Sequence, residues 1–226
     1  MSRWQAVVFD LDDTLYPERD FVLSGFRAVA QWAETHLGIG AEHGYRQLCS
    51  LYTAGIRGDT FNRWLHAQGM SAPNLPQQLV KVYREHTPSL TPFRGVLDVL
   101  SRLRSGHRLG LVSDGYIDVQ RRKLAALGLE TQFDAVVFSD YWGREAWKPS
   151  TRPFEEVLRR LGVAACFAVY VADNPIKDFV GARGAGMSSV WTRHPDGEYA
   201  QLVPPTPQHA PDYTIGSFAE FENLLG

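Results

Sequence analysis

The sequence predicts an α/β fold with a doubly wound, mainly parallel sheet and an inserted α-helical domain. Short, continuously apolar runs alternate with helical patterns, which is typical of strands buried on both faces of a parallel sheet. One long stretch near the N-terminus lacks such runs and shows only helical spacing. With 226 residues, the chain is long enough for one substantial core and a smaller second domain.

The predicted strands and helices of the core follow one another along the chain. Strands are predicted over residues 6–9, 109–112, 135–138 and 167–172, with helices over 96–103, 119–127, 154–161 and 179–185. A last strand near Tyr213 and a helix over 218–225 follow the proline-rich loop 204–207. Right-handed crossovers then place the strands in one sheet with helices on both faces.

The stretch over residues 16–90 is predicted to be entirely helical. Its glycine-containing breaks at 38–40, 55–59 and 69–76 divide it into about four helices. We therefore expect two domains, a Rossmann-like core formed by residues 1–15 and 91–226 and a helical cap formed by residues 16–90.

Composition and charge argue against several classes of protein. The formal net charge is −2 and no basic run is present, so nucleic acid is not an expected partner. The first apolar run, Ala6-Val7-Val8-Phe9, is too short for a signal peptide or a membrane span. Cys49 and Cys166 lack disulfide or zinc-site spacing and are expected to be buried thiols. We expect a cytoplasmic protein that binds no membrane, as a monomer or a homodimer.

Polar side chains follow three of the predicted strands. Asp10 and Asp12 come directly after the first strand, and their spacing places both carboxylates on one side of an extended chain. Acidic turns also follow strands without any catalytic role, so this run alone is ambiguous. Ser113 and Asp173 follow two further strands. Because ligands of doubly wound sheets bind beyond the carboxyl ends of the strands, these residues indicate a common ligand.

Four segments resemble the signatures of the haloacid dehalogenase superfamily. The first is Phe9-Asp10-Leu11-Asp12-Asp13-Thr14-Leu15, the second Leu111-Val112-Ser113-Asp114-Gly115, the third Lys148-Pro149, and the fourth runs from Asp173 to Asp178. They follow in the family's order. The insert between the first two lies where members of subfamily I carry a C1-type helical cap.

The resemblance implies a phosphatase that hydrolyses a small phosphomonoester through an aspartyl-phosphate. Asp10 would be the nucleophile, and Asp12 would be the general acid and base. The phosphate-binding residues would be Ser113, Asp114, Gly115 and Lys148, the amides of the second signature assisting at the start of a helix. Many family members have Asn where this chain has Asp114, so the resemblance does not decide which contact Asp114 makes with the phosphate.

The resemblance also implies Mg²⁺ as the cofactor. Its ligands would be Asp10, Asp173 and the main-chain carbonyl of Asp12, with Thr14, Asn174 and Asp178 around them. Ionised Asp10, Asp173 and Asp178 would carry three negative charges, which Lys148 and a divalent cation together neutralise. Taken singly, Lys148 would be read as an exposed surface lysine and Ser113 as a helix N-cap.

Three other functions are compatible with these residues. A sugar phosphomutase would keep Asp10 and Asp12 but would return the phosphoryl group to the sugar while water is excluded. A haloacid dehalogenase would need neither magnesium nor a second carboxylate, so Asp12 argues against it. A non-catalytic binding protein would be expected to lack one of these groups. No motif fixes the phosphate ester, because loop and cap residues decide specificity. Arg57 in the cap either reaches a substrate anion or simply faces solvent.

Overall fold

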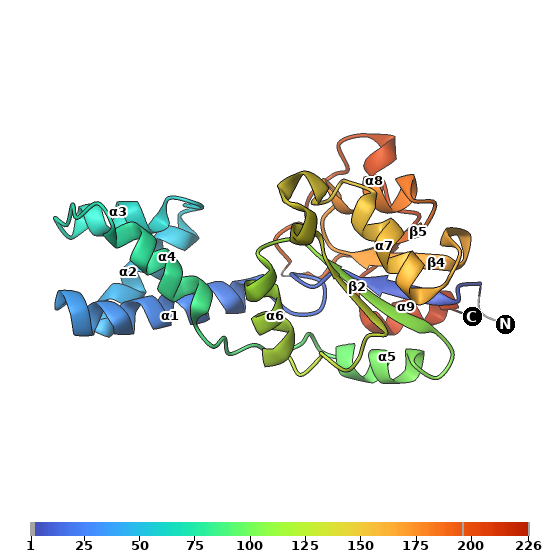
Figure 1. Ribbon diagram of the computed structural model, residues 1–226, viewed down its shortest axis with the longest axis horizontal. Coiled ribbons are helices and arrows are strands. Elements are labelled where there is room, and N and C mark those ends of the chain that lie inside the picture. Colours follow the sequence, from blue (N-terminus) through green and yellow to red (C-terminus); the bar gives the residue numbers. More distant parts are fainter. Residues whose placement is uncertain (1–2, 196, 226) are drawn as a thin grey trace. The chain divides into compact units, whose positions relative to one another are not determined.

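The computed structural model describes residues 3–195 and 197–225. The chain divides into two compact units, one formed by Met1–Glu18 with Leu90–Gly226 and the other by Arg19–Ser89. The first unit holds the sheet and its flanking helices, and the second is helical (Figure 1). Within the described residues, no helix is both long and apolar enough to cross a membrane.

The first unit is built on six parallel strands in the order β3-β2-β1-β4-β5-β6. The strands are β1 (Ala6–Phe9), β2 (Arg108–Ser113), β3 (Ala135–Phe138), β4 (Ala168–Ala172), β5 (Ser188–Thr192) and β6 (Tyr213–Ile215). The chain runs outward from β1 through β2 to β3 and then continues on the other side of β1 through β4. The predicted doubly wound α/β fold is confirmed, and its strand order reverses between β1 and β4, where such sheets bind ligands.

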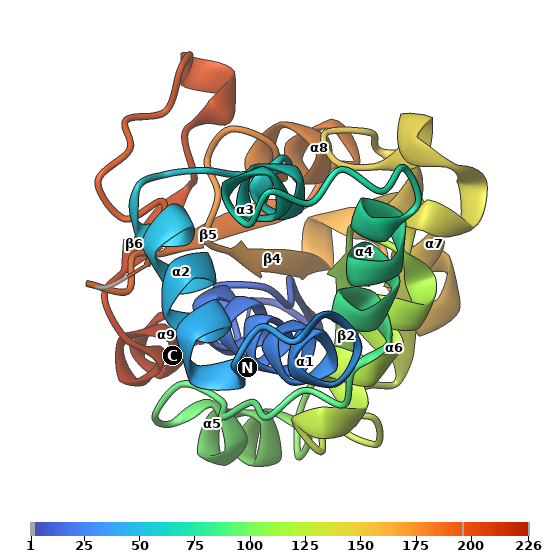
Figure 2. The same ribbon diagram turned by 90° about the vertical axis from the view of Figure 1, so that its left-hand side faces the viewer.

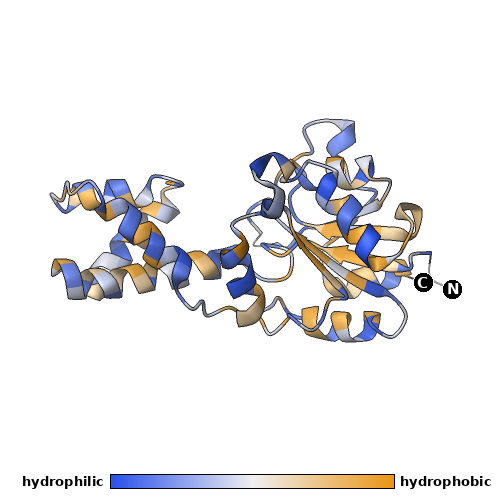
Figure 3. Ribbon diagram, viewed as in Figure 1, coloured by the Kyte–Doolittle hydropathy of each residue, from blue (hydrophilic) through white to orange (hydrophobic). Residues whose placement is uncertain are grey.

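Helices cover both faces of this sheet. They are α5 (Val96–Leu103), α6 (Ile117–Ala126), α7 (Arg152–Leu161), α8 (Asp178–Gly184) and α9 (Phe218–Leu225), with short 3₁₀ turns at Ser139–Trp142, Arg144–Ala146, Ala165–Phe167 and Pro207–His209. Figure 1 shows α7 and α8 on one side of the strands and α5 and α9 on the other. β1 and β4 are buried along their whole length, and Figure 3 shows the central strands as hydrophobic segments. Burial on both faces explains why the strands read as continuous apolar runs.

Most predicted elements of this unit lie within two residues of their observed positions. The predicted helix over 119–127, for example, begins two residues earlier, at Ile117. β5 is absent from the prediction, because it opens with Ser188 and Ser189 and so lacks a long apolar run. The expectation of two buried thiols is wrong, since Cys166 is exposed and Cys49 is only half-buried.

The second unit consists of four helices, which Figure 2 shows most clearly. They are α1 (Glu18–Leu37), α2 (Ala41–Thr53), α3 (Thr60–Ala67) and α4 (Leu75–Glu85). Their apolar faces form a core that includes Phe26, Leu48, Trp64 and Leu79. The break predicted over 69–76 is too long, because α4 already begins at Leu75 with a proline in its first turn, where no hydrogen-bond donor is needed.

Gly110 in β2 lets α7 approach the sheet closely. A Cβ atom at this position would lie 2.8 Å from Cγ2 of Val157 and 3.1 Å from Cδ1 of Leu161, both on α7. Any larger side chain must therefore displace these side chains or the elements that carry them.

Replacing Gly110 by valine should lower the free energy of unfolding by about 1–3 kcal/mol, because overpacking forces side chains out of their favoured rotamers. Urea unfolding followed by circular dichroism measures this change. Gly106→Ala is the matched control, because nothing lies within 4 Å of a Cβ there. An unchanged midpoint for Gly110→Val would contradict the close packing of α7 on β2.

Candidate active site

Three predicted site residues lie at neighbouring strand ends. Asp10 follows β1, Ser113 ends β2 and Asp173 follows β4. β1 pairs with both other strands, with Phe9 opposite Leu111 on one side and Val171 on the other. The parallel register therefore brings the three side chains to one edge of the sheet, and all three are buried.

Lys148 is buried between two carboxylates. Its Nζ atom lies 2.6 Å from Oδ1 of Asp10 and 2.8 Å from Oδ1 of Asp178, and it donates a hydrogen bond of 3.0 Å to the hydroxyl of Tyr170. Burial acts to lower the pKa of Lys148, but the charges of Asp10 and Asp178 raise it well above its usual value. The lysine is thus a charged, buried group, and the reading of it as a surface lysine is wrong.

The carboxylates of Asp10, Asp173 and Asp178 form a compact acidic cluster. One oxygen from each lies within 4.8 Å of the others. Thr14 donates a hydrogen bond of 3.2 Å to Oδ1 of Asp173, whereas Oδ2 of Asp173 is buried and is without a hydrogen-bond partner among the described residues. The backbone amide of Asn174 donates to Oδ2 of Asp178 at 3.0 Å. Oδ2 of Asp173 is therefore an oxygen that only a further donor or a cation can satisfy.

Burial shapes the electrostatics of this cluster. It raises the pKa of Asp10 to about 7, against the opposing effect of Lys148. It also raises the pKa of Asp173 well above its usual value, with the charges of Asp178 and Asp10 adding to the effect. Carboxylate oxygens in this arrangement are ligands that suit a hard divalent cation such as Mg²⁺.

Asp12 is held by three donors that the sequence analysis did not identify. Its Oδ1 accepts hydrogen bonds from the hydroxyl of Tyr16 at 2.5 Å and from Nζ of Lys123 at 2.7 Å, and its Oδ2 accepts one from Nε2 of Gln120 at 2.7 Å. Burial acts to raise the pKa of Asp12, but the charge and hydrogen bond of Lys123, with the bonds from Tyr16 and Gln120, lower it overall. Asp12 is therefore ionised in this arrangement.

The loop after β2 is tied to the loop that carries Lys148. Oδ1 of Asp114 accepts hydrogen bonds from the hydroxyl of Ser139 at 2.5 Å and from the backbone amide of Lys148 at 3.2 Å. Nζ of Lys177, another residue that the sequence analysis did not identify, lies 3.7 Å from Oδ2 of Asp114. The side chain of Asp114 thus joins loops, while Gly115 adopts a φ of 109° that other residues rarely take, just before α6.

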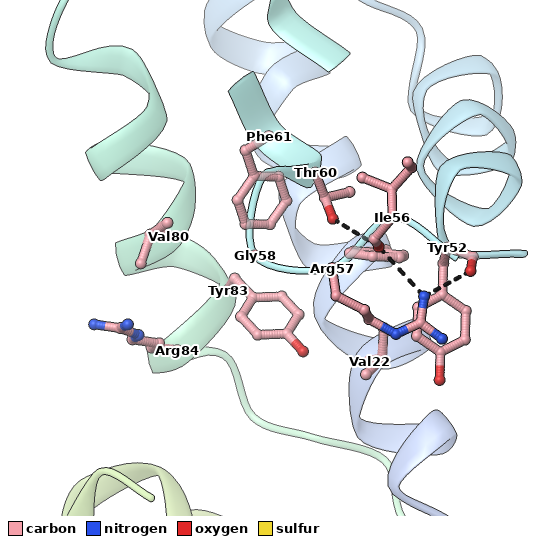
Figure 4. A pocket seen from close by; sticks show the side chains of 11 residues that line it. Val22, Tyr52, Ile56, Arg57, Gly58, Thr60, Phe61, Val80, Tyr83 and Arg84 are labelled. Atoms are coloured by element: carbon pink, nitrogen blue, oxygen red, sulfur yellow. Dashed lines mark hydrogen bonds between the residues drawn. The ribbon is translucent and has the colours of Figure 1, made fainter. Parts of the chain in front are cut away.

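The helical unit has a cavity of its own, of about 240 Å³ (Figure 4). Its lining is mainly aromatic and aliphatic and includes Phe26, Phe61 and Tyr83. The guanidinium of Arg57 lies 3.7 Å from the ring centroid of Tyr52, and its Nη1 donates to the carbonyl oxygen of Tyr52 at 2.7 Å. Arg57 is therefore held by its own loop and helix.

Known proteins share this fold and these segments. The sequence pattern described as haloacid dehalogenase-like hydrolase matches residues 7–192. A glyceraldehyde 3-phosphate phosphatase of Methanopyrus kandleri is 35% identical over 219 residues, which cover 93% of this chain and 92% of the relative.

Two solved structures are also similar to this chain. The structure of a HAD phosphatase from Thermococcus onnurineus is 27% identical, with 98% of each chain covered and a TM-score of 0.63. A 2-haloacid dehalogenase from Pseudomonas syringae is 24% identical, with 98% of each chain covered and a TM-score of 0.68, a likeness of fold alone. The predicted family is confirmed, and the chain belongs to the haloacid dehalogenase-like hydrolases.

Proposed function

We propose that this hydrolase is a magnesium-dependent phosphatase that cleaves a small phosphomonoester through an aspartyl-phosphate at Asp10. The observation that carries the proposal is the buried Asp10–Lys148–Asp178 arrangement beside Asp173, at the point where the strand order reverses. The similarity to a glyceraldehyde 3-phosphate phosphatase supports a phosphate ester of a small metabolite as the substrate.

In the first step, a carboxylate oxygen of Asp10 attacks phosphorus, and the bond between phosphorus and the ester oxygen breaks. Asp12, two residues further along, takes up a proton from solvent as the ester binds, gives it to the departing alkoxide and is left ionised. The negative charge of a bound phosphate beside Asp12 offsets the charge of Lys123 and raises the proton affinity of the Asp12 carboxylate. The alcohol leaves, and the phosphoryl group stays on Asp10.

In the second step, water attacks the phosphorus of the aspartyl-phosphate. Asp12 accepts a proton from this water, the bond between phosphorus and the Asp10 oxygen breaks, and inorganic phosphate forms with Asp10 restored. The three donors on Asp12 favour its ionised form, which is the form that a general base needs.

The phosphate oxygens would be bound by Ser113, Lys148 and the backbone amides that lead into α6. The hydroxyl of Ser113 accepts a hydrogen bond from Nε2 of Gln120 at 2.6 Å, so its own proton is available to a phosphate oxygen. Lys148 is already charged and buried beside Asp10, where phosphorus must come. Preorganised donors of this kind stabilise developing negative charge without reorganising during the reaction.

The residues present fit a magnesium ion. Asp10 and Asp173 would hold it with the main-chain carbonyl of Asp12, and the unpartnered Oδ2 of Asp173 is the atom that most needs such a cation. Both oxygens of Asp178 already accept hydrogen bonds or an ion pair, from Asn174 and Lys148, so Asp178 supports the site from outside. When bound, the ion offsets negative charge on the carboxylates and on the phosphate.

The second carboxylate favours phosphatase over dehalogenase chemistry. A halide ion leaves without a proton, so a dehalogenase has no need of an acid beside its nucleophile. Here Asp12 is oriented by three hydrogen bonds, which an incidental acidic turn residue would not require. The helical unit would act as the cap that selects the alcohol part of the ester.

Replacing Asp10 by asparagine should lower phosphate release by at least about 10³-fold, because an amide cannot form the acyl phosphate. Steady-state phosphate release from a metabolite panel that includes glyceraldehyde 3-phosphate measures this loss. Asp118→Asn is the control, since this aspartate on α6 is highly exposed and should be dispensable. Normal turnover by Asp10→Asn would contradict the mechanism.

Removing divalent cations with a chelator should slow phosphate release by about 100-fold or more, and added Mg²⁺ should restore it. The reason is that three buried carboxylates repel a phosphate dianion when no divalent cation offsets their charge. The same phosphate assay follows the loss and the recovery. Full activity in the chelator, with no bound metal by elemental analysis, would refute the requirement.

The free energy of unfolding of the metal-free protein should fall as pH rises. Burial raises the pKa of both Asp10 and Asp13 to about 7, so the folded state retains protons that the unfolded state releases. The resulting stabilisation is complete below the usual carboxyl pKa and is lost as pH rises through about 7. Urea unfolding in chelator should show a loss on the order of a few kcal/mol between pH 5 and pH 8.

Two comparisons show whether Asp10 and the absence of a cation cause this loss of stability with rising pH. Asp10→Asn should lose less stability over this pH range than the wild type, because one of the titrating groups is gone. Added Mg²⁺ should stabilise the wild type more at pH 8 than at pH 5, because protons compete with the cation. Metal-free protein that is as stable at pH 8 as at pH 5 would contradict the claim that burial raises the pKa of Asp10 and Asp13.

A further inference from the structure

We propose that Gln120 and Lys123 are positioning residues that fix the carboxylate of Asp12 for its acid and base steps. Gln120 in addition orients the hydroxyl of Ser113 toward the phosphate. The inference rests on the phosphatase function proposed above. Both residues belong to α6, the helix that follows β2.

The buried face of α6 is unusual in its composition. It consists of Gln120, Lys123 and Leu124, and the two polar residues are only 1% and 3% exposed. Burying an amide and an ammonium group costs free energy unless each finds partners. A helix that merely covered the sheet would carry apolar residues at these positions, so the polar pair needs another explanation.

That explanation lies in what the two side chains bind. Nζ of Lys123 lies 2.7 Å from Oδ1 of Asp12, and Nε2 of Gln120 lies 2.7 Å from Oδ2. With the hydroxyl of Tyr16, three donors occupy a carboxylate that offers about four acceptor positions. The side chain of Asp12 is therefore fixed in orientation, with about one acceptor position left to exchange a proton.

The exposed fractions of Asp12 and Lys123 agree with this arrangement. The side chain of Asp12 is 21% exposed, whereas that of Lys123 is only 4% exposed. The lysine thus binds the carboxylate from the protein interior and leaves the outer side of Asp12 accessible to an ester oxygen or a water molecule.

Gln120 also connects the acid to the phosphate-binding hydroxyl. The same Nε2 atom that donates to Asp12 donates to Oγ of Ser113 at 2.6 Å. Because Oγ accepts this bond, its proton must point elsewhere, and its contact with the carbonyl oxygen of Asp114 is long, at 3.5 Å. One amide group thus sets the distance between the proton donor for the leaving group and the donor for the phosphate.

A purely structural role for the pair makes a different prediction from a positioning role. Lys123 could simply neutralise Asp12 and Glu18, whose Oε1 lies 3.5 Å from Nζ. Loss of a structural group would slow the reaction of every ester alike. Loss of a positioning group should slow most the esters whose leaving group needs a proton, because general acid catalysis typically contributes about 10²–10⁴-fold.

The test compares two esters in single-turnover reactions with excess enzyme. Glyceraldehyde 3-phosphate releases an alkoxide that must be protonated, whereas 4-nitrophenyl phosphate releases a stable phenolate. Gln120→Met and Lys123→Met should slow alcohol release from the first ester by about 10²-fold and from the second by less than about 5-fold. Lys81→Met, at an exposed lysine, should change neither rate.

Two further variants keep the result decisive. Tyr16→Phe removes only one donor from Asp12 and should cause a smaller loss of the same selectivity, even where a Gln120 variant fails to fold. In an Asp12→Asn background, Gln120→Met should add less than about a twofold loss, because coupled residues are not additive. Equal losses on both esters, or full additivity with Asp12→Asn, would overturn the positioning role. A wild-type protein that hydrolyses neither of these esters nor any other ester of the metabolite panel would instead refute the proposed function.

Discussion

The constraint on which this site depends is the balance of buried charge at the carboxyl ends of β1 and β4. Asp10, Asp173 and Asp178 approach within 4.8 Å of one another, and Lys148 forms ion pairs with two of them, Asp10 and Asp178. At an effective dielectric of about 20, two like charges about 4 Å apart repel by about 4 kcal/mol. Burial raises the pKa of both Asp10 and Asp173, the charge of Asp178 adds to the effect, and a further cation would favour the ionised forms.

The rest of the first unit supports this cluster. The parallel sheet supplies Asp10 and Asp173 from neighbouring strands, and Asp114 ties the backbone of Lys148 to the loop after β2. On the other side of the nucleophile, α6 directs polar side chains at Asp12. Each charged group in the site is thus bound by at least one residue from a different element, which limits how far any of them can move.

The sequence alone predicted the features that depend on continuous local patterns of apolar residues. β1 and α5 have long apolar or amphipathic patterns, so the fold class and the family were predictable from local residues, and both predictions are confirmed. β5 was missed because Ser189 is buried through hydrogen bonds to Asp212, a tertiary contact that no local pattern reveals. Gln120 and Lys123 were missed for a related reason, since polar helix residues are read as solvent-facing. The roles given to Asp10 and its neighbours stay predictions.

The central claim is that Asp10 carries the phosphoryl group between the two steps. Its most direct test is rapid acid quenching of a single turnover of 4-nitrophenyl phosphate by the Asp12→Asn protein, followed by mass spectrometry of the peptide that contains Asp10. The phenolate leaves without a proton, so the first step proceeds, and the slowed second step should let the intermediate accumulate. We expect one phosphoryl group on Asp10 that appears with phenolate release and disappears as phosphate forms. Phosphate release with this peptide unmodified throughout, or with the phosphoryl group on another residue, would contradict the account.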